Sequence, residues 1–238
     1  MLAYLQLPIR FDAQRMQQEV TSLAQQYWNM HYNKRHYTGD WSIIALHAVD
    51  GQPGNIYSIH NTADQASISR YRNTPLLDEC AYLKEVLDYF QCDKTTVRLM
   101  KLDAGAVILP HRDTDMNIEA GEARFHIPVQ TNDQVEFYLQ GERIPMNEGE
   151  CWYLNLSLEH SVGNHGSSDR IHLVIDCIVN DWLTQWFSKP GLFKKEITDD
   201  AASESYSKED KLQIIEALRR MNTEVSNEMA DKLMLEKG

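Results

Sequence analysis

The sequence has no surplus of positive charge and no long apolar run. Lysine and arginine number 23 against 35 aspartates and glutamates, which gives a formal net charge of −12 over 238 residues. Because binding to nucleic acid or to an anionic membrane surface needs a basic face, this balance argues against both kinds of partner. No apolar run approaches the roughly 20 residues that span a bilayer, so we expect no membrane segment.

Cysteines are few and widely spaced, and no C-x-x-C pair occurs among Cys80, Cys92, Cys151 and Cys177. We therefore expect buried free thiols rather than a disulfide framework. The N-terminus, MLAYLQLPIRF, has no charged lead, long apolar segment or small-residue cleavage site, so we expect no signal peptide. These features predict a reducing, cytoplasmic location. Internal repeats and low-complexity tracts are also missing, which argues against a repeat architecture.

The periodicity of the apolar residues predicts helices and strands in the first 94 residues. Residues 2–7 form a strand candidate, and a helix follows with Asp12 as its N-cap and Phe11 packed against Met16. Residues 41–49 predict another strand, and a second helix begins at Pro75 with Thr74 as its cap.

From residue 95 the period changes to short apolar or alternating runs. Turn residues separate these runs at intervals typical of a β-sandwich or barrel. They cover residues 95–102, 106–111, 124–129, 134–139, 143–146, 151–156, 160–164 and 170–179. The fold class predicted is therefore mainly β, a small barrel supported by N-terminal helices.

The domain boundaries follow from these patterns. We predict one domain at 1–190, with helical support from 1–94 and the β core at 95–182, then a polar linker at 191–206. Residues 207–238 predict a C-terminal helical extension, because Ser207 can cap it and an apolar stripe follows. We expect that helix to pack on the barrel or on a second copy of the chain, the latter giving a homo-oligomer.

The sequence LPHRDTD places two metal-binding side chains at the end of a strand candidate. His111 and Asp113 are two residues apart, so both can point to the same side of a strand. Two histidines and one carboxylate on one face of a metal are the ligands of non-haem Fe(II) oxygenases, and adjacent residues cannot supply all three. His160, in SLEHSVGN of the same β block, is the candidate for the third ligand.

Further polar residues are predicted where a β core normally has aliphatic side chains. We expect the GNHGSSD turn to bring Arg170 back beside His160 on a neighbouring strand, where a buried guanidinium can bind a carboxylate through two hydrogen bonds. Arg124 and His126 in RFHIP share one face by alternation. Buried polar groups need partners or a ligand, so these residues indicate a binding pocket inside the barrel.

The segments HRD, RFHIPV, WYLNLSLEHSVGN and RIHLVID together resemble the aspartyl/asparaginyl β-hydroxylase-like family of Fe(II)- and 2-oxoglutarate-dependent dioxygenases. Among its members, the sequence is most similar to bacterial enzymes that hydroxylate free amino acids, such as the L-proline cis-hydroxylases. The resemblance covers about residues 95–182. It implies a double-stranded β-helix core, of the jelly-roll or cupin-like type.

The resemblance also implies a role for each matching residue. His111, Asp113 and His160 would be the iron ligands, and Arg170 would pair with the distal carboxylate of 2-oxoglutarate. Arg124 and His126 match an R-x-H motif that contacts carboxylates of the cosubstrate or substrate. Related halogenases lack the carboxylate ligand, so Asp113 favours hydroxylation. The loop 114–123 is longer than in the family, and a loop beside a pocket commonly determines substrate choice.

Three more residues are candidates for binding the substrate. Arg98 lies on the strand that leads to the metal ligands, His172 shares a face with Arg170, and Trp41 can form a wall of the pocket. Each also has an ordinary interpretation: a surface arginine, a core histidine with its hydrogen bonds satisfied, and a core tryptophan. His165 lies in the turn, where we expect it to be exposed.

The function predicted is hydroxylation of an unactivated C–H bond in a small carboxylate-bearing molecule, such as a free amino acid or a derivative. The reaction would use Fe(II), 2-oxoglutarate and O2 and release succinate and CO2. Two alternatives remain open at this point: a cupin-like metalloenzyme that does not use 2-oxoglutarate, and a non-catalytic barrel that binds a small anion. Neither alternative needs Arg170 as a cosubstrate anchor.

Overall fold

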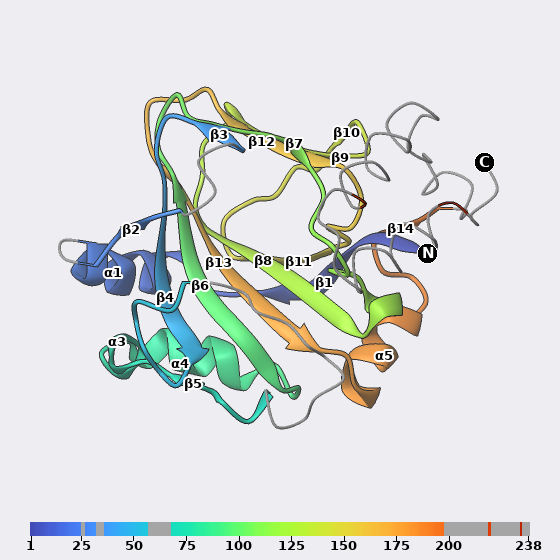
Figure 1. Ribbon diagram of the computed structural model, residues 1–238, viewed down its shortest axis with the longest axis horizontal. Coiled ribbons are helices and arrows are strands. Elements are labelled where there is room, and N and C mark those ends of the chain that lie inside the picture. The colour runs from blue at the N-terminus through green and yellow to red at the C-terminus, as the bar shows by residue number, and fades with distance from the viewer. Residues whose placement is uncertain (25–26, 32–35, 57–67, 198–218, 220–233, 235–238) are drawn as a thin grey trace. The chain divides into compact units, whose positions relative to one another are not determined.

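A computed structural model describes residues 1–24, 27–31, 36–56 and 68–197, together with Arg219 and Met234 (Figure 1). The chain divides into two units, Met1–Glu196 and Ile197–Gly238. Apart from Arg219 and Met234, the predicted C-terminal helix at 207–238 lies outside the described residues. The predicted linker, 191–206, contains a short strand at Lys194–Glu196 that belongs to the first unit.

Two antiparallel sheets form the first unit. The smaller sheet consists, in order, of β10 (Glu142–Arg143), β9 (Val135–Leu139), β12 (His160–Asn164), β7 (Val107–His111) and β3 (Tyr37–Thr38). The larger sheet consists, in order, of β14 (Lys194–Glu196), β1 (Leu2–Arg10), β11 (Glu150–Leu154), β8 (Glu122–Gln130), β13 (Arg170–Ile178), β6 (Lys94–Leu102), β4 (Trp41–Val49) and β2 (Asn29–Met30), with β5 (Tyr71–Asn73) beside β4.

The chain passes repeatedly between the two sheets from β6 to β13. Strands β6, β8, β11 and β13 lie in the larger sheet, whereas β7, β9, β10 and β12 lie in the smaller one. This connectivity is that of a double-stranded β-helix, or jelly roll. It confirms the predicted fold class, and each of the eight predicted runs overlaps a strand, although the run 143–146 shares only Arg143 with β10. The first 94 residues supply strands as well as helices, because β1 and β4 extend the larger sheet on either side.

Helices contact the larger sheet (Figure 1). They are α1 (Ala13–Ala24), α3 (Pro75–Asp78), α4 (Ala81–Asp88), the 3-10 turn η1 (Ile118–Ala120) and α5 (Asp181–Ser188). Asp12 caps α1 as predicted, since its Oδ1 accepts from the backbone N–H of Arg15 at 3.1 Å. In the described residues, no helix has the length and apolar character required to cross a membrane.

The second predicted helix begins as expected, with Thr74 at the N-cap position and Pro75 as its first residue, but it differs from the prediction in two details. It is broken into α3 and α4 at Glu79 and Cys80, and the Thr74 hydroxyl makes no capping hydrogen bond. Thr74 is fully buried against β4, and its hydroxyl donates instead to the carbonyls of Ala45 and Leu46, at 3.0 and 3.2 Å. Both carbonyls lie on the buried strand β4, so the Thr74 hydroxyl is bound there and not to the backbone N–H groups at the start of α3.

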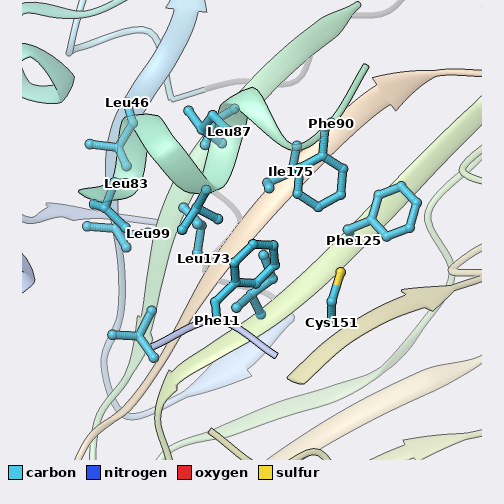
Figure 2. Close-up of a cluster of buried hydrophobic side chains, with 14 of the residues drawn as sticks. Phe11, Leu46, Leu83, Leu87, Phe90, Leu99, Phe125, Cys151, Leu173 and Ile175 are labelled. Atoms are coloured by element: carbon cyan, nitrogen blue, oxygen red, sulfur yellow. The ribbon is translucent and has the colours of Figure 1, made fainter. Parts of the chain in front are cut away.

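Side-chain alternation gives the larger sheet an apolar face and a polar face. The apolar face packs beneath the helices, and Figure 2 shows Leu83, Leu87 and Phe90 beside side chains of β4, β6, β8 and β13. On β6, β8 and β13 the odd-numbered residues belong to this core: Val97, Leu99, Phe125, Ile127, Leu173 and Ile175. The even-numbered residues point to the other side, between the sheets. They include Arg98, Arg124, His126, Arg170, His172 and Asp176, all of them buried.

All four cysteines are free thiols, as predicted. Cys80, Cys151 and Cys177 are buried, whereas Cys92 is half-buried. Burial raises the pKa of the Cys80 thiol to about 12, so this side chain stays protonated at neutral pH. It packs as a small apolar group in the core beneath the helices.

Candidate active site

Two histidines lie side by side at the edge of the space between the sheets. His111 ends β7, His160 begins β12, and the two residues are direct partners in the antiparallel pairing. Each Nδ1 contacts the carbonyl oxygen two residues earlier, Leu109 at 2.8 Å and Leu158 at 3.0 Å. A neutral imidazole that donates from Nδ1 has its lone pair on Nε2. Both rings are therefore oriented to bind a cation through Nε2.

Asp113 follows β7 and completes the cluster. Its backbone N–H donates to the carbonyl of Leu156 at 2.8 Å, which anchors this residue to the connection between β11 and β12. Its Oδ1 lies 3.8 Å from His111 Nε2, and Oδ2 accepts from Arg124. One ligand atom each from His111, Asp113 and His160 lie within 4.8 Å of one another. The predicted triad is thus brought together by the fold.

The protonation states of this cluster suit a divalent cation. Burial lowers the pKa of His160 to about 4, so its imidazole is neutral at pH 7. For Asp113, burial raises the pKa, but the charge of Arg124 and the nearby imidazoles outweigh burial and hold it below its usual value. Metal binding requires neutral histidine and ionised carboxylate, and His160 and Asp113 adopt these states at neutral pH. The donor set therefore fits an Fe(II) ion.

A cavity of about 280 Å³ adjoins the cluster and lies between the two sheets. Its lining includes four arginines and one aspartate, so it is positively charged within a chain of net charge −12. Both sheets contribute residues to the cavity lining, so side chains that are far apart in the sequence meet there. The lining residues used below are His31, Trp41, Arg98, His111, Asp113, Met116, Arg124, His126, Phe137, His160 and Arg170.

Arg170 has no acidic partner within the described part of the chain. It is only 3% exposed, and burial lowers its pKa to about 9. Its Nη2 donates to His172 Nδ1 at 2.8 Å, whereas the buried Nε makes no hydrogen bond.

The prediction that Arg170 lies on a strand neighbouring that of His160 was wrong, because β12 and β13 belong to different sheets. The turn between them crosses the barrel, and both residues nevertheless line the same cavity.

Arg124 is bound by two protein carboxylates. Its Nη1 donates to Asp113, while Nε and Nη2 donate to the two carboxylate oxygens of Asp176 at 2.6 and 2.9 Å. The expectation that Arg124 binds a carboxylate of the cosubstrate or substrate stays a prediction, and in the structure protein carboxylates occupy its three nitrogens. Asp176 was missed, although alternation places it on the same face of β13 as Arg170 and His172.

His126 contacts a second histidine, His172, and its predicted contact with a cosubstrate or substrate carboxylate stays a prediction. Its Nδ1 lies 3.3 Å from His172 Nδ1, and that atom accepts from Arg170, which can only donate. The hydrogen in the His126–His172 contact must then belong to His126, which leaves His126 Nε2 as an acceptor. This Nε2 is buried and has no partner in the structure. His126 thus offers the cavity a hydrogen-bond acceptor rather than a donor for a carboxylate.

The predicted substrate residues fall into two groups. Arg98 and Trp41 line the cavity, whereas His172 lies behind Arg170 and does not line it. The Trp41 Nε1 is buried without a hydrogen-bond partner, and its ring stacks on His31 with centroids 3.6 Å apart and planes 7° apart. His31 was missed because it lies in a short irregular stretch with no motif. His165 is exposed, as predicted.

The loop 114–123 lies at the cavity. Met116 is buried and lines it, and its carbonyl accepts from the backbone N–H of Leu156 at 3.1 Å. Asp113 and Met116 therefore both bind the backbone of Leu156, which ties this loop to the segment that precedes His160. The loop is thus positioned to contact a bound molecule.

Comparison with known proteins places this site in context. A family model described as aspartyl/asparaginyl β-hydroxylase matches residues 9–179. L-proline cis-4-hydroxylase from Rhizobium meliloti (strain 1021) is 26% identical over 171 residues, which are 71% of this chain and 58% of that enzyme. The chain thus matches little more than half the length of this relative.

Solved structures of low sequence identity are also similar. A 2OG-Fe(II) oxygenase family oxidoreductase from Burkholderia pseudomallei has a TM-score of 0.46 and 15% identity, covering 74% of this chain and 85% of its own. A Pseudomonas putida prolyl-4-hydroxylase has a TM-score of 0.44 and 11% identity, covering 76% of this chain and 94% of its own.

The family match spans the jelly roll, both histidines, Asp113 and Arg170, and thereby confirms the resemblance found in the sequence. The relative from Rhizobium meliloti confirms the relation to the proline hydroxylases. The chain belongs to the aspartyl/asparaginyl β-hydroxylase family.

Proposed function

We propose that this protein is an Fe(II)- and 2-oxoglutarate-dependent dioxygenase that hydroxylates a small carboxylate-bearing molecule, such as a free amino acid or a derivative. The observation that carries the proposal is the convergence of His111, Asp113 and His160, whose ligand atoms lie within 4.8 Å beside a basic cavity. Two histidines and a carboxylate with open coordination positions are the ligand set of non-haem iron oxygenases.

His111, Asp113 and His160 would hold the iron, and the metal when bound would supply O2 activation that a protein side chain cannot. The overall reaction consumes 2-oxoglutarate, O2 and the substrate and yields succinate, CO2 and the hydroxylated product. Arg170 supports the cosubstrate part of the proposal, because a buried guanidinium without an acidic partner favours a carboxylate from outside the protein. Phe137 and Met116 line the cavity and help to exclude water from it.

The substrate part of the proposal is supported by two features of the cavity wall. Arg98 lines the cavity and attracts a carboxylate, while the buried Nε2 of His126 can accept a hydrogen bond from an amino group. A molecule with both groups, as in an amino acid, would match both features. Trp41, with an unpartnered buried Nε1, supplies a flat wall and one further donor.

The proposal is tested by adding Fe(II) and 2-oxoglutarate to the purified protein without oxygen. A weak visible charge-transfer band is expected for the wild type and for His165→Ala, whose exposed side chain lies outside the cavity lining. His160→Ala should give no band. Absence of the band in the wild type would contradict the proposal and favour a cupin-like enzyme without 2-oxoglutarate or a simple anion-binding barrel.

The substrate is tested separately by measuring succinate release under O2 with a panel of free amino acids and then short peptides. Stimulation by one or more free amino acids is expected. A positive charge-transfer band with no stimulation by any member of the panel would reject the amino-acid substrate but retain the iron and 2-oxoglutarate site.

A further inference from the structure

Asp176 joins the metal cluster to the basic wall of the cavity, and nothing in the proposed reaction uses it. It lies on β13 and is 1% exposed. Its carboxylate accepts from the Thr96 hydroxyl at 2.6 Å, from Arg98 Nη2 at 2.8 Å and from Arg124 Nε and Nη2 at 2.6 and 2.9 Å. One carboxylate therefore fixes two arginines that project between the sheets.

The two arginines contact different parts of the site. Arg124 reaches Asp113 through its third nitrogen, Nη1, so that Asp113 Oδ2 is bound and Oδ1 lies on the side of His111 Nε2. Arg98 lines the cavity in which the proposed substrate would bind. Asp113, Asp176, Arg98 and Arg124 carry two negative and two positive charges, so a divalent cation at the proposed site would lie beside a cluster of balanced charge.

We propose that Asp176 is a positioning residue for the metal ligand Asp113, acting through Arg124, and for the substrate-side Arg98. This inference rests on the proposed iron site. With Asp176 in place, Arg124 has one nitrogen left for Asp113 and leaves the other oxygen of Asp113 to a metal. Without it, Arg124 is free to bind both oxygens of Asp113, and an unbalanced positive charge remains beside the cation site.

The test measures binding of Mn(II) alone to the protein, by electron paramagnetic resonance of the free ion. Asp176→Asn should weaken Mn(II) binding by about 10- to 100-fold, as is typical for loss of an outer partner of a metal ligand. Thr96→Val is the matched control, because it removes one neutral donor to Asp176 and leaves both arginine contacts. It should bind Mn(II) as the wild type does, and circular dichroism should confirm that each variant is folded.

A double-mutant cycle with Arg124→Met distinguishes positioning from a general structural role. If Asp176 acts on Asp113 through Arg124, Asp176→Asn should weaken Mn(II) binding much less in the Arg124→Met background than in the wild type. The double variant removes opposite charges together, so it remains measurable even where Asp176→Asn alone does not fold. An equal loss of affinity from Asp176→Asn in both backgrounds, or unchanged affinity in a folded Asp176→Asn, overturns the inference. Failure of the wild type to bind Mn(II) would instead reject the proposed metal site itself.

Discussion

Three buried arginines project between the sheets, and their partners determine what each can do. Arg124 has protein carboxylates at all three nitrogens, and Arg98 shares Asp176 with it. Arg170 instead meets a neutral imidazole and has a pKa lowered to about 9 by burial. A charge that is buried without a counter-ion costs free energy, and a bound anion would recover it. Arg170 is therefore the arginine expected to respond most to a ligand.

We predict that Arg170→Gln weakens 2-oxoglutarate binding much more than metal binding. Loss of a charge-assisted hydrogen bond costs about 1.5–3 kcal/mol, so we expect a rise of about 10- to 100-fold in the 2-oxoglutarate concentration needed for half-maximal charge-transfer absorbance. Arg143→Gln is the control, because Arg143 is exposed and donates to the carbonyls of Asp133 and Val135 away from the metal cluster. Equal titration curves for Arg170→Gln and the wild type would reject Arg170 as the anchor.

The metal triad could be predicted from the sequence, but the partners of the arginines could not. His111 and Asp113 are two residues apart at a strand end, which indicated a shared side, although β7 ends at His111 and the backbone N–H of Asp113 is bound to the carbonyl of Leu156. Whether Arg124 meets a ligand or a protein carboxylate depends on which strands are neighbours. Pairing of β8 with β13 puts Arg124 opposite Asp176, and that register is a tertiary property absent from either segment alone.

At the scale of elements, one glycine joins the N-terminal strand to the core of the jelly roll. Gly149 lies in the turn before β11, where its N–H donates to Pro128 and its carbonyl accepts from the N–H of Phe11, both at 2.8 Å. Its φ is +78°, and a Cβ added there would lie 2.2 Å from the carbonyl oxygen of Phe11. Both the left-handed backbone and the close approach thus require glycine.

We predict that Gly149→Ala destabilises the protein while leaving the metal cluster chemically unchanged. A non-glycine residue forced into this backbone costs about 1–3 kcal/mol, and each kcal/mol corresponds to about 2–4 °C in the melting temperature of a domain of this size. Gly54→Ala is the control, because nothing lies within 4 Å of a Cβ added at that position. Calorimetry that gives the same melting temperature for both variants would contradict this interpretation.

Strands were more predictable than helix ends and linkers. Between residues 95 and 179, alternation and turn residues mark the strands because one face of the sheet is apolar and the other polar. The break between α3 and α4 carries no glycine or proline, so the sequence reads as one helix. Strand β14 was assigned to the linker because its sequence, KKE, is polar, and only its pairing with β1 makes it a strand.

For the molecule as a whole, burial of several histidines sets the response to acid. Burial, with a further contribution from Arg98, lowers the pKa of His31 to about 3, and burial lowers the pKa values of His126 and His172 well below their ordinary range. In the unfolded chain a histidine has a pKa of about 6.5. Between these values the unfolded state binds protons that the folded state does not, so acid favours unfolding.

We therefore predict that the free energy of unfolding of the metal-free protein falls steadily as the pH is lowered from about 6.5 toward 4. Each such histidine contributes up to about 1.4 kcal/mol per pH unit in this window, because that is the free-energy equivalent of one bound proton. His31→Phe keeps an aromatic ring stacked on Trp41 but cannot bind a proton, so its stability should fall less steeply with acid. Urea denaturation at intervals between pH 7 and pH 4 measures the slope.

His165→Ala serves as the comparison for this measurement, since it removes a histidine whose side chain is 56% exposed and lies outside the cavity lining. His126 and His172 remain in His31→Phe, so the slope should be reduced rather than abolished. Parallel curves for His31→Phe and the wild type would show that His31 is protonated equally in the folded and unfolded states. In that case the stacked pair with Trp41 would have to open to solvent in acid, and the cavity wall would be less rigid than the structure indicates.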